Sequence, residues 1–298
     1  MEEFRFERVK VILGEVDRNT RDGLKSALYH YGFRNVVITD KASVINETAS
    51  NDEADLLICS TDYEDGDVHD LIHKIRHHEI GSNPFVFVIT LIAEPSKELI
   101  RKVIDSGSDD ILVKPISSTT LYERIIKLTR ERKRFVVTSD YIGPNRRKKY
   151  RPGSEKIPEI DVPNSLQFMA LGDVNTAQLQ GDIERCSKLI DELKIERNAV
   201  QIDYLVKHIL SSDTGDVAEA EVTSHFNRLA SVSEDICYRL ERLDHAKKDE
   251  KGLLCRQMVD VAGRLRADLP SRDPQDIDLL GQLAEDIMRV FHYKRIAA

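Results

Sequence analysis

The pattern of apolar residues in the first half of the chain alternates between strands and helices. Five short apolar runs predict strands at residues 8–14, 36–38, 56–59, 85–91 and 110–113. After each run, apolar residues at helical spacing predict a helix, at residues 17–31, 42–51, 68–78, 96–106 and 119–132. Because the strands are apolar on both faces, we expect a parallel sheet that is covered by helices on both sides. This half therefore predicts a doubly wound α/β domain.

The last third of the chain has a different pattern, without strand-like runs. Apolar residues follow alternating spacings of three and four from Leu179 to Tyr204 and again from Val222 to Leu243, which is typical of a seam between helices. Two more amphipathic stretches follow, and Asp273-Pro274 is typical of a helix start. We therefore expect an all-α helical bundle at residues 173–298 that dimerises or docks a partner.

The segment between these two patterns is basic and contains prolines. Residues 130–156 hold ten Lys and Arg against three Asp and Glu, although the whole chain has a net charge of −8. Pro144, Pro152 and Pro158 argue against a continuous helix here. The predicted organisation is a domain at residues 1–134, a linker at 135–172 and the helical domain at 173–298.

The composition narrows the possible functions. The 298 residues are 41% hydrophobic and 32% charged, which is enough apolar material for packed domains. Trp is absent and aromatic residues make up 6%, which argues against a surface that stacks nucleic-acid bases. The four cysteines are far apart in sequence and predict reduced thiols, as in a cytoplasmic protein. The polar start and the lack of a long apolar run predict neither a signal peptide nor a membrane span.

The α/β half also carries an ordered set of short motifs. Glu15 follows the first predicted strand, Gly32-Phe33 closes the first helix, and DLLIC leads to the end of the third strand. Gly107 then precedes the pair Lys114-Pro115. In this order, residues 8–132 resemble the receiver domain of two-component response regulators. The resemblance implies a flavodoxin-like fold, a protein partner such as a histidine kinase, and phosphoryl transfer to an aspartate.

The resemblance assigns residues at the carboxyl ends of the strands to the phosphotransfer site. Glu15 matches the first acid of the metal-binding pair, whereas Val16 stands at the second. Ser60 falls on the position of the phosphoacceptor aspartate, in a segment that matches without gaps from Asp55 to Arg76. A serine hydroxyl without a nearby base is a poor acceptor in this exchange. The resemblance thus implies a pseudo-receiver that is not phosphorylated at residue 60.

Three further positions match the family. Thr90 matches the hydroxyl that senses the phosphoryl group, with a longer loop after it than usual, and Lys114 matches the conserved-type lysine. Ile111 stands at the switch position, where the family often has an aromatic residue. In an ordinary receiver these positions transmit phosphorylation to the surface formed by the fourth and fifth helices. We expect partner proteins to bind at that surface here.

An alternative keeps phosphoryl transfer but moves the acceptor. Asp62, two residues after Ser60, would take the phosphoryl group, while Glu15 and Asp17 would help to hold Mg²⁺. Apart from such a magnesium site, we expect no cofactor. The chain has no glycine-rich phosphate loop, nucleophile elbow or HExxH pair, so we expect no enzyme.

Two other motifs suggest ligands. Arg146, Arg147 and Arg151 spell RRxxxR, which is similar to the arginine half of PilZ sites for cyclic-di-GMP and also suits nucleic-acid phosphates. No D/N-x-S-x-x-G segment follows, so a solvated linker is the favoured interpretation. A row of histidines at His69, His73 and His77 has the spacing of one helix face. Without a converging acid or cysteine, this row predicts a wet helix face rather than a transition-metal site.

Overall fold

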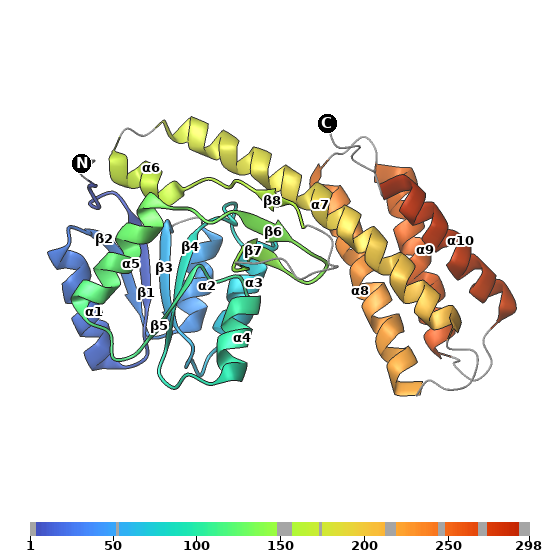
Figure 1. Ribbon diagram of the computed structural model, residues 1–298, viewed down its shortest axis with the longest axis horizontal. Helices are drawn as coiled ribbons and strands as arrows, with labels where there is room; N and C mark the ends of the chain where they lie inside the picture. The colour runs from blue at the N-terminus through green and yellow to red at the C-terminus, as the bar shows by residue number, and fades with distance from the viewer. Residues whose placement is uncertain are drawn as a thin grey trace. The chain divides into compact units, whose positions relative to one another are not determined.

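The computed structural model describes residues 4–51, 54–147, 157–172, 175–211, 219–243, 248–267 and 273–291. The chain divides into two compact units. The first comprises Met1–Val136 and Tyr141–Ser187, and the second comprises Val137–Asp140 and Lys188–Ala298. The first unit contains the α/β half, and the second contains most of the long helices (Figure 1).

The first unit is built on a parallel sheet of five strands. Their order is β2-β1-β3-β4-β5, so β1, β3 and β4 lie in the interior of the sheet. The bounds are β1 Lys10–Gly14, β2 Asn35–Thr39, β3 Leu56–Ser60, β4 Phe87–Ile92 and β5 Asp110–Val113. The register pairs Gly14 with Cys59 and Ser60 with Leu91, which brings the carboxyl ends of these strands to one edge. The five strands and the doubly wound fold predicted from sequence are confirmed.

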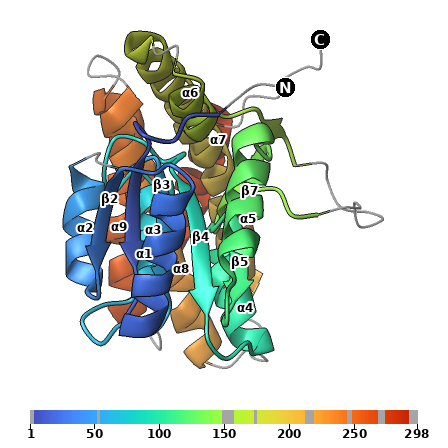
Figure 2. The ribbon, with the colours of Figure 1, turned by 90° about the vertical axis from the view of Figure 1, so that its left-hand side faces the viewer.

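Helices cover both faces of this sheet (Figures 1 and 2). They are α1 Arg18–His30, α2 Ala42–Ser50, α3 Val68–Arg76, α4 Lys97–Asp105 and α5 Ser118–Arg130. Apolar residues of α1 and α5 pack with Leu13, Ile58 and Leu91 on one face. Residues of α2 and α3 pack with Cys59 and Val88 on the other face. Alternate residues of a strand point to opposite faces, which explains why neighbouring strand residues join different cores.

The described residues of the segment predicted as a linker are folded, and apart from Val137–Asp140 they belong to the first unit. It contains β6 Phe135–Val137, β7 Ile142–Pro144, β8 Glu159–Ile160 and the helix α6 Ser165–Leu171. Phe135, Ile142 and Leu166 are buried, and the Asn164 amide donates hydrogen bonds to the last carbonyls of α5. Burial of these apolar side chains stabilises the docked position. Pro144 ends β7 and Pro158 directly precedes β8, whereas Pro152 lies outside the described residues.

A buried ionic network lies where this segment meets the sheet. The Arg76 guanidinium is fully buried and contacts the Asp109 carboxylate at 2.9 Å and the Gly107 carbonyl at 2.9 Å. Arg132 lies over the Phe87 ring, 3.8 Å from its centroid, and 3.5 Å from Asp109. Burial lowers the pKa of both arginines, and Asp109 opposes that change. Shared pairing with one buried carboxylate makes the burial of two cations tolerable.

Gly107 and Gly143 allow the β7 segment to approach the sheet closely. Gly107 has a φ of +95°, and a Cβ built there would lie 2.9 Å from the Ile142 carbonyl oxygen. A Cβ at Gly143 would lie 3.0 Å from the Gly107 Cα. Any larger residue at either position would push β7 away from the loop before β5.

The second unit contains the helical region predicted from the sequence. The described helices of this region are α7 Thr176–Ser211, α8 Glu219–Leu243, α9 Lys248–Ala267 and α10 Pro274–Phe291, and the first turns of α7 belong to the first unit. Their apolar rows form one core that includes Phe226, Met258 and Ile287. The predicted seam on α7 is wrong at its end, because Val200 and Tyr204 are exposed. The core instead continues through a row shifted by about half a turn: Ala199, Ile202, Leu205, Val206 and Ile209.

All four cysteines are free, and three of them are buried. Among the described helices, none has the length and apolar character needed to cross a membrane.

Candidate functional site: a cluster around Lys114

The carboxyl edge of the parallel sheet gathers three of the predicted site residues. Glu15 directly follows β1, Ser60 ends β3, and Lys114 directly follows β5. In a parallel sheet these positions converge on the same crevice, which is where ligands of open α/β sheets bind. Glu15 and Ser60 are fully buried, and the Lys114 side chain is 13% exposed.

Lys114 is the centre of this cluster. Its Nζ lies 3.1 Å from each carboxylate oxygen of Glu15 and 3.2 Å from the Ser60 hydroxyl. Asp62 is a third neighbour, with its carboxylate 3.6 Å from the same Nζ. The Ser60 hydroxyl also donates to Asp62 at 3.3 Å. The ammonium group therefore neutralises a buried acid and a half-exposed one, and the serine bridges them.

Asp17 is placed differently from the prediction. Its carboxylate caps the first turn of α1 by accepting a hydrogen bond from the Thr20 backbone N–H at 2.8 Å. That hydrogen bond is the main cause that lowers the pKa of Asp17. A carboxylate that caps the N-terminus of a helix in this way satisfies backbone N–H donors that have no partner within the helix. Asp17 thus has a local structural role rather than a position on the cation site.

Two other acids in the loop after β3 are also caps. Asp65 accepts hydrogen bonds from the backbone N–H groups of Ala42 and Ser43, which lowers its pKa to about 2. Asp67 caps α3; burial raises its pKa, but bonds from Lys102 and His69 outweigh burial and lower it overall. Of this acidic loop, Asp62 is the acid that reaches Lys114.

Thr90 lies outside the cluster, which corrects the prediction. It sits beside Cys59 in the sheet, on the face that α2 and α3 cover, and its hydroxyl lies 2.9 Å from the Ser108 hydroxyl. Ser60 is beside Leu91 and therefore points to the opposite face. The residue of β4 beside Ser60 is thus the apolar Leu91 instead of the expected sensing hydroxyl. The longer loop after Thr90 is the signal that this position was shifted.

Tyr63 belongs to the surroundings of the site and was not predicted. Its hydroxyl is buried against Gly14, where a Cβ would lie 2.3 Å from that oxygen. Burial raises the pKa of this hydroxyl strongly. Gly14 is therefore needed beside Glu15 for the Tyr63 ring to close the loop over the end of β1. Ile111, the predicted switch position, is half-buried on β5.

These residues do not fit the magnesium site of a receiver. Such a cation needs several oxygen ligands held close together. Glu15 is engaged by Lys114, Val16 is apolar and 40% exposed, and Asp17 caps α1. A magnesium ion would have to displace the lysine from a buried carboxylate before it could bind.

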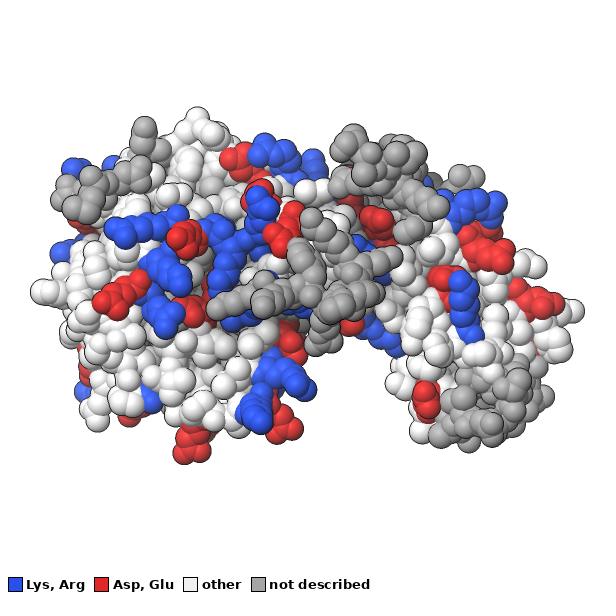
Figure 3. All heavy atoms as spheres, in the orientation of Figure 1, with Lys and Arg blue, Asp and Glu red and all other residues white. Residues whose placement is uncertain are grey.

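The predicted arginine site is not assembled in the described residues. Arg146 is half-buried and donates a hydrogen bond to the Ser108 carbonyl, whereas Arg147 is exposed. Arg151 lies outside the described residues. On the face of the first unit seen in Figure 3, Lys and Arg are mixed with Asp and Glu. A single-sign basic surface, as nucleic-acid binding favours, is not found on that face.

Parts of this chain are similar to known proteins. Residues 11–126 match the response regulator receiver domain family. A receiver domain protein (CheY-like) from Methanospirillum hungatei is 20% identical, with a TM-score of 0.37, over 40% of this chain and 91% of its own. The RcsB response regulator of Salmonella typhimurium is 14% identical, with a TM-score of 0.35, over 79% of this chain and 92% of its own.

Among curated proteins, a DNA ligase of Methanococcus maripaludis is 27% identical over 165 residues. That match takes in 51% of this chain and only 28% of the ligase. The family match coincides with the five-stranded sheet and its order β2-β1-β3-β4-β5. Residues 11–126 are therefore a response regulator receiver domain.

Proposed function

We propose that this receiver domain regulates by protein contacts and without phosphorylation of residue 60. The observation that carries the proposal is the Lys114 cluster, in which Ser60 replaces the acceptor carboxylate and Lys114 already neutralises Glu15. Phosphoryl transfer needs a nucleophilic carboxylate and bound cations that meet the phosphoryl oxygens. Here the lysine holds in place the groups that a phosphoryl group would otherwise organise. The domain is thus a non-enzymatic, cytoplasmic adaptor that a histidine kinase or another signalling protein recognises.

Phosphodonor treatment tests this proposal directly. The full chain is incubated with phosphoramidate and Mg²⁺, next to an ordinary receiver domain as a positive control, and its intact mass is measured. We expect no added phosphoryl group on the chain under conditions that load the control. A stoichiometric phosphoryl group on the wild-type chain after this treatment would contradict the proposal.

The alternative, phosphoryl transfer to a displaced acceptor, has a structural basis at Asp62. Its carboxylate is 49% exposed and lies 3.6 Å from the Lys114 Nζ, so a donor could reach it beside a cation. Phosphorylation that disappears in Asp62→Asn and persists in Asp65→Asn would identify a displaced acceptor. Asp65 is the matched control because it lies in the same loop but caps α2.

We propose that the helical unit transmits the signal of the receiver domain by self-association. Val200 and Tyr204 are one turn apart on α7 and are 37% and 53% exposed, which leaves an apolar strip on the surface of this helix. We expect the full chain to dimerise through this strip. Light scattering should then give a dimer for the wild type and a monomer for Tyr204→Glu. Tyr29→Glu, at a tyrosine of the receiver domain with 39% exposure, should stay dimeric.

A further inference from the structure

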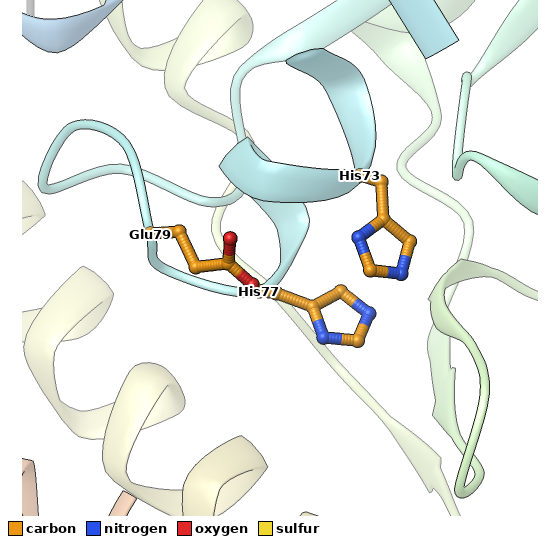
Figure 4. Close-up of side chains that lie close together, drawn as sticks. All are labelled: His73, His77 and Glu79. Atoms are coloured by element: carbon orange, nitrogen blue, oxygen red, sulfur yellow. The ribbon is translucent and has the colours of Figure 1, made fainter. Parts of the chain in front are cut away.

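Three side chains with metal-ligating atoms meet at the end of α3, away from the Lys114 cluster. They are His73 in the last turn of α3, His77 directly after it, and Glu79 in the turn that follows. One ligand atom from each lies within 4.8 Å of the others. Figure 4 shows the two imidazole rings side by side, with the Glu79 carboxylate turned towards His77.

The backbone explains why these residues converge. His73 and His77 are four residues apart, so they share one face of the helix, and their ring centroids lie 3.8 Å apart. His78 then adopts the left-handed conformation with a φ of +63°, which is unusual for a residue other than glycine. The Glu79 N–H returns to the Lys74 carbonyl at 2.9 Å. This reversal brings the carboxylate back beside the two rings.

The local electrostatics favour a cation at this position. The carbonyl end of a helix carries partial negative charge, and Glu79 adds a full one. Of the basic residues along α3, Lys74 pairs with Asp70 at 2.7 Å and interacts with Glu79 only secondarily, and Arg76 pairs with Asp109 at 2.9 Å. His69, the first histidine of the row, contacts Asp67 at 2.8 Å and does not join the group.

We propose that His73, His77 and Glu79 bind one divalent metal ion of the zinc class. Two imidazoles and one carboxylate suit such an ion, and three protein ligands leave a fourth position open. Tetrahedral ligand distances of ~2.0–2.2 Å require ligand atoms about 3.4 Å apart, so rotation of the side chains closes the site. The sequence predicted a wet face because it showed no converging acid. The turn at His78 supplies that acid.

The proposed ion would also order the turn between α3 and β4. The same turn carries His78, whose Nε2 lies 2.9 Å from the Ser187 hydroxyl in α7. A metal that joins His73, His77 and Glu79 would restrict the turn that holds this contact. Metal binding can be tested independently of the proposed function, because the metal ligands are His73, His77 and Glu79, whereas the proposed function rests on Ser60 and Lys114.

Titration of the chelator-treated full chain with Zn²⁺ tests the proposal. We expect saturable binding of one ion, followed by calorimetry, and slower hydrogen exchange in residues 73–80 when the ion is bound. Glu79→Gln and His73→Phe should each weaken binding by at least about tenfold, since even loss of a group that merely orients a ligand costs about 10–100-fold. The phenyl ring keeps the stacking on His77 but removes the ligand nitrogens.

Matched controls decide the outcome. His30→Phe changes an exposed histidine on α1, and His69→Phe changes the neighbouring histidine of the same row. Both should bind Zn²⁺ as the wild type does, provided that circular dichroism shows a folded chain. Absence of saturable binding, or equal affinity in wild type, Glu79→Gln and His73→Phe, would overturn the proposal.

Discussion

Each unit of the molecule buries a cluster of charge, and the two clusters differ in where they lie. In the receiver domain, Lys114 pairs with buried Glu15 at the edge of the sheet and with Asp62, which is 49% exposed. In the helical unit, Arg239 of α8 is fully buried and contacts Asp191 of α7 at 2.6 Å. The first cluster has an open side and the second is enclosed.

This difference shows that a buried ion pair can either be accessible to another molecule or be sensitive to substitution, depending on where it lies. At the carboxyl edge of a parallel sheet, loops from several strands meet, so the Lys114 cluster is accessible to another molecule through Asp62. Between packed helices, the central pair of Arg239 and Asp191 is enclosed, with side-chain exposures of 0% and 2%, and Asp235 and Arg242 complete its pairing at 25% and 32% exposure. An enclosed ion pair contributes little net stability as a pair, but loss of one partner leaves a buried charge. The enclosed cluster should therefore be the more sensitive to substitution.

The largest expected effect is in the enclosed cluster. Asp191→Ala removes the carboxylate that both Arg239 and Arg242 contact, and so takes one of two paired acids away from a buried guanidinium. We expect a loss of about 3 kcal/mol in the free energy of unfolding, measured by urea titration. Asp203→Ala, which breaks the surface pair with Lys207 on the same helix, should cost less than about 1 kcal/mol. Equal losses in the two variants would show that burial does not distinguish these pairs.

The next effect is at the sheet edge. Lys114→Met leaves the Glu15 carboxylate buried without its cation, so we expect a loss of about 2 kcal/mol in the same measurement. Glu15→Gln in the Lys114→Met background should recover part of this loss, because the buried charge is then gone. Lys97→Met, at an exposed lysine of α4, is the control and should change stability little. A loss as large as that of Asp191→Ala would remove the distinction between open and enclosed clusters.

The smallest effect concerns a lysine near the Arg239 cluster. Lys194 is 2% exposed and donates to the carbonyls of Thr138 and Ser139 at 3.1 and 2.6 Å. Burial lowers its pKa to about 8, with Asp235 opposing this change. The unfolded chain, with a lysine pKa of about 10.4, then binds more protons above pH 8, so stability rises with pH.

We expect this lysine to contribute about 1 kcal/mol of additional stability between pH 8 and pH 9. The comparison is the pH dependence of the urea midpoint in the wild type and in Lys194→Met. The variant keeps an apolar stem in the same place and should lack this rise. Parallel curves for the two proteins would show that Lys194 keeps its ordinary pKa in the folded state.

The receiver half was largely predictable because its signals are local. Each strand is a continuous apolar run and each helix a local period, so their order determined the sheet. The positions of Glu15, Ser60 and Lys114 followed, because residues after parallel strands converge on one edge. The α7 seam failed at Val200 and Tyr204, since a shifted apolar row on the same helix satisfies a similar spacing.

The sequence by itself determined the α/β order, the helical region, and the absence of a carboxylate at residue 60. Only the tertiary structure decided that Thr90 faces away from Ser60, that Asp17 caps a helix, and that Arg146 of the basic segment contacts the Ser108 carbonyl. It also decided that Glu79 joins His73 and His77. The physical reason is that the apolar periodicity that predicts helices and strands is local in the sequence. The hydrogen-bond and ion-pair partners of a polar side chain instead come from distant segments, and the sequence offers several of them. Strand register, close packing at glycines and a left-handed turn determine which of these partners each polar side chain contacts.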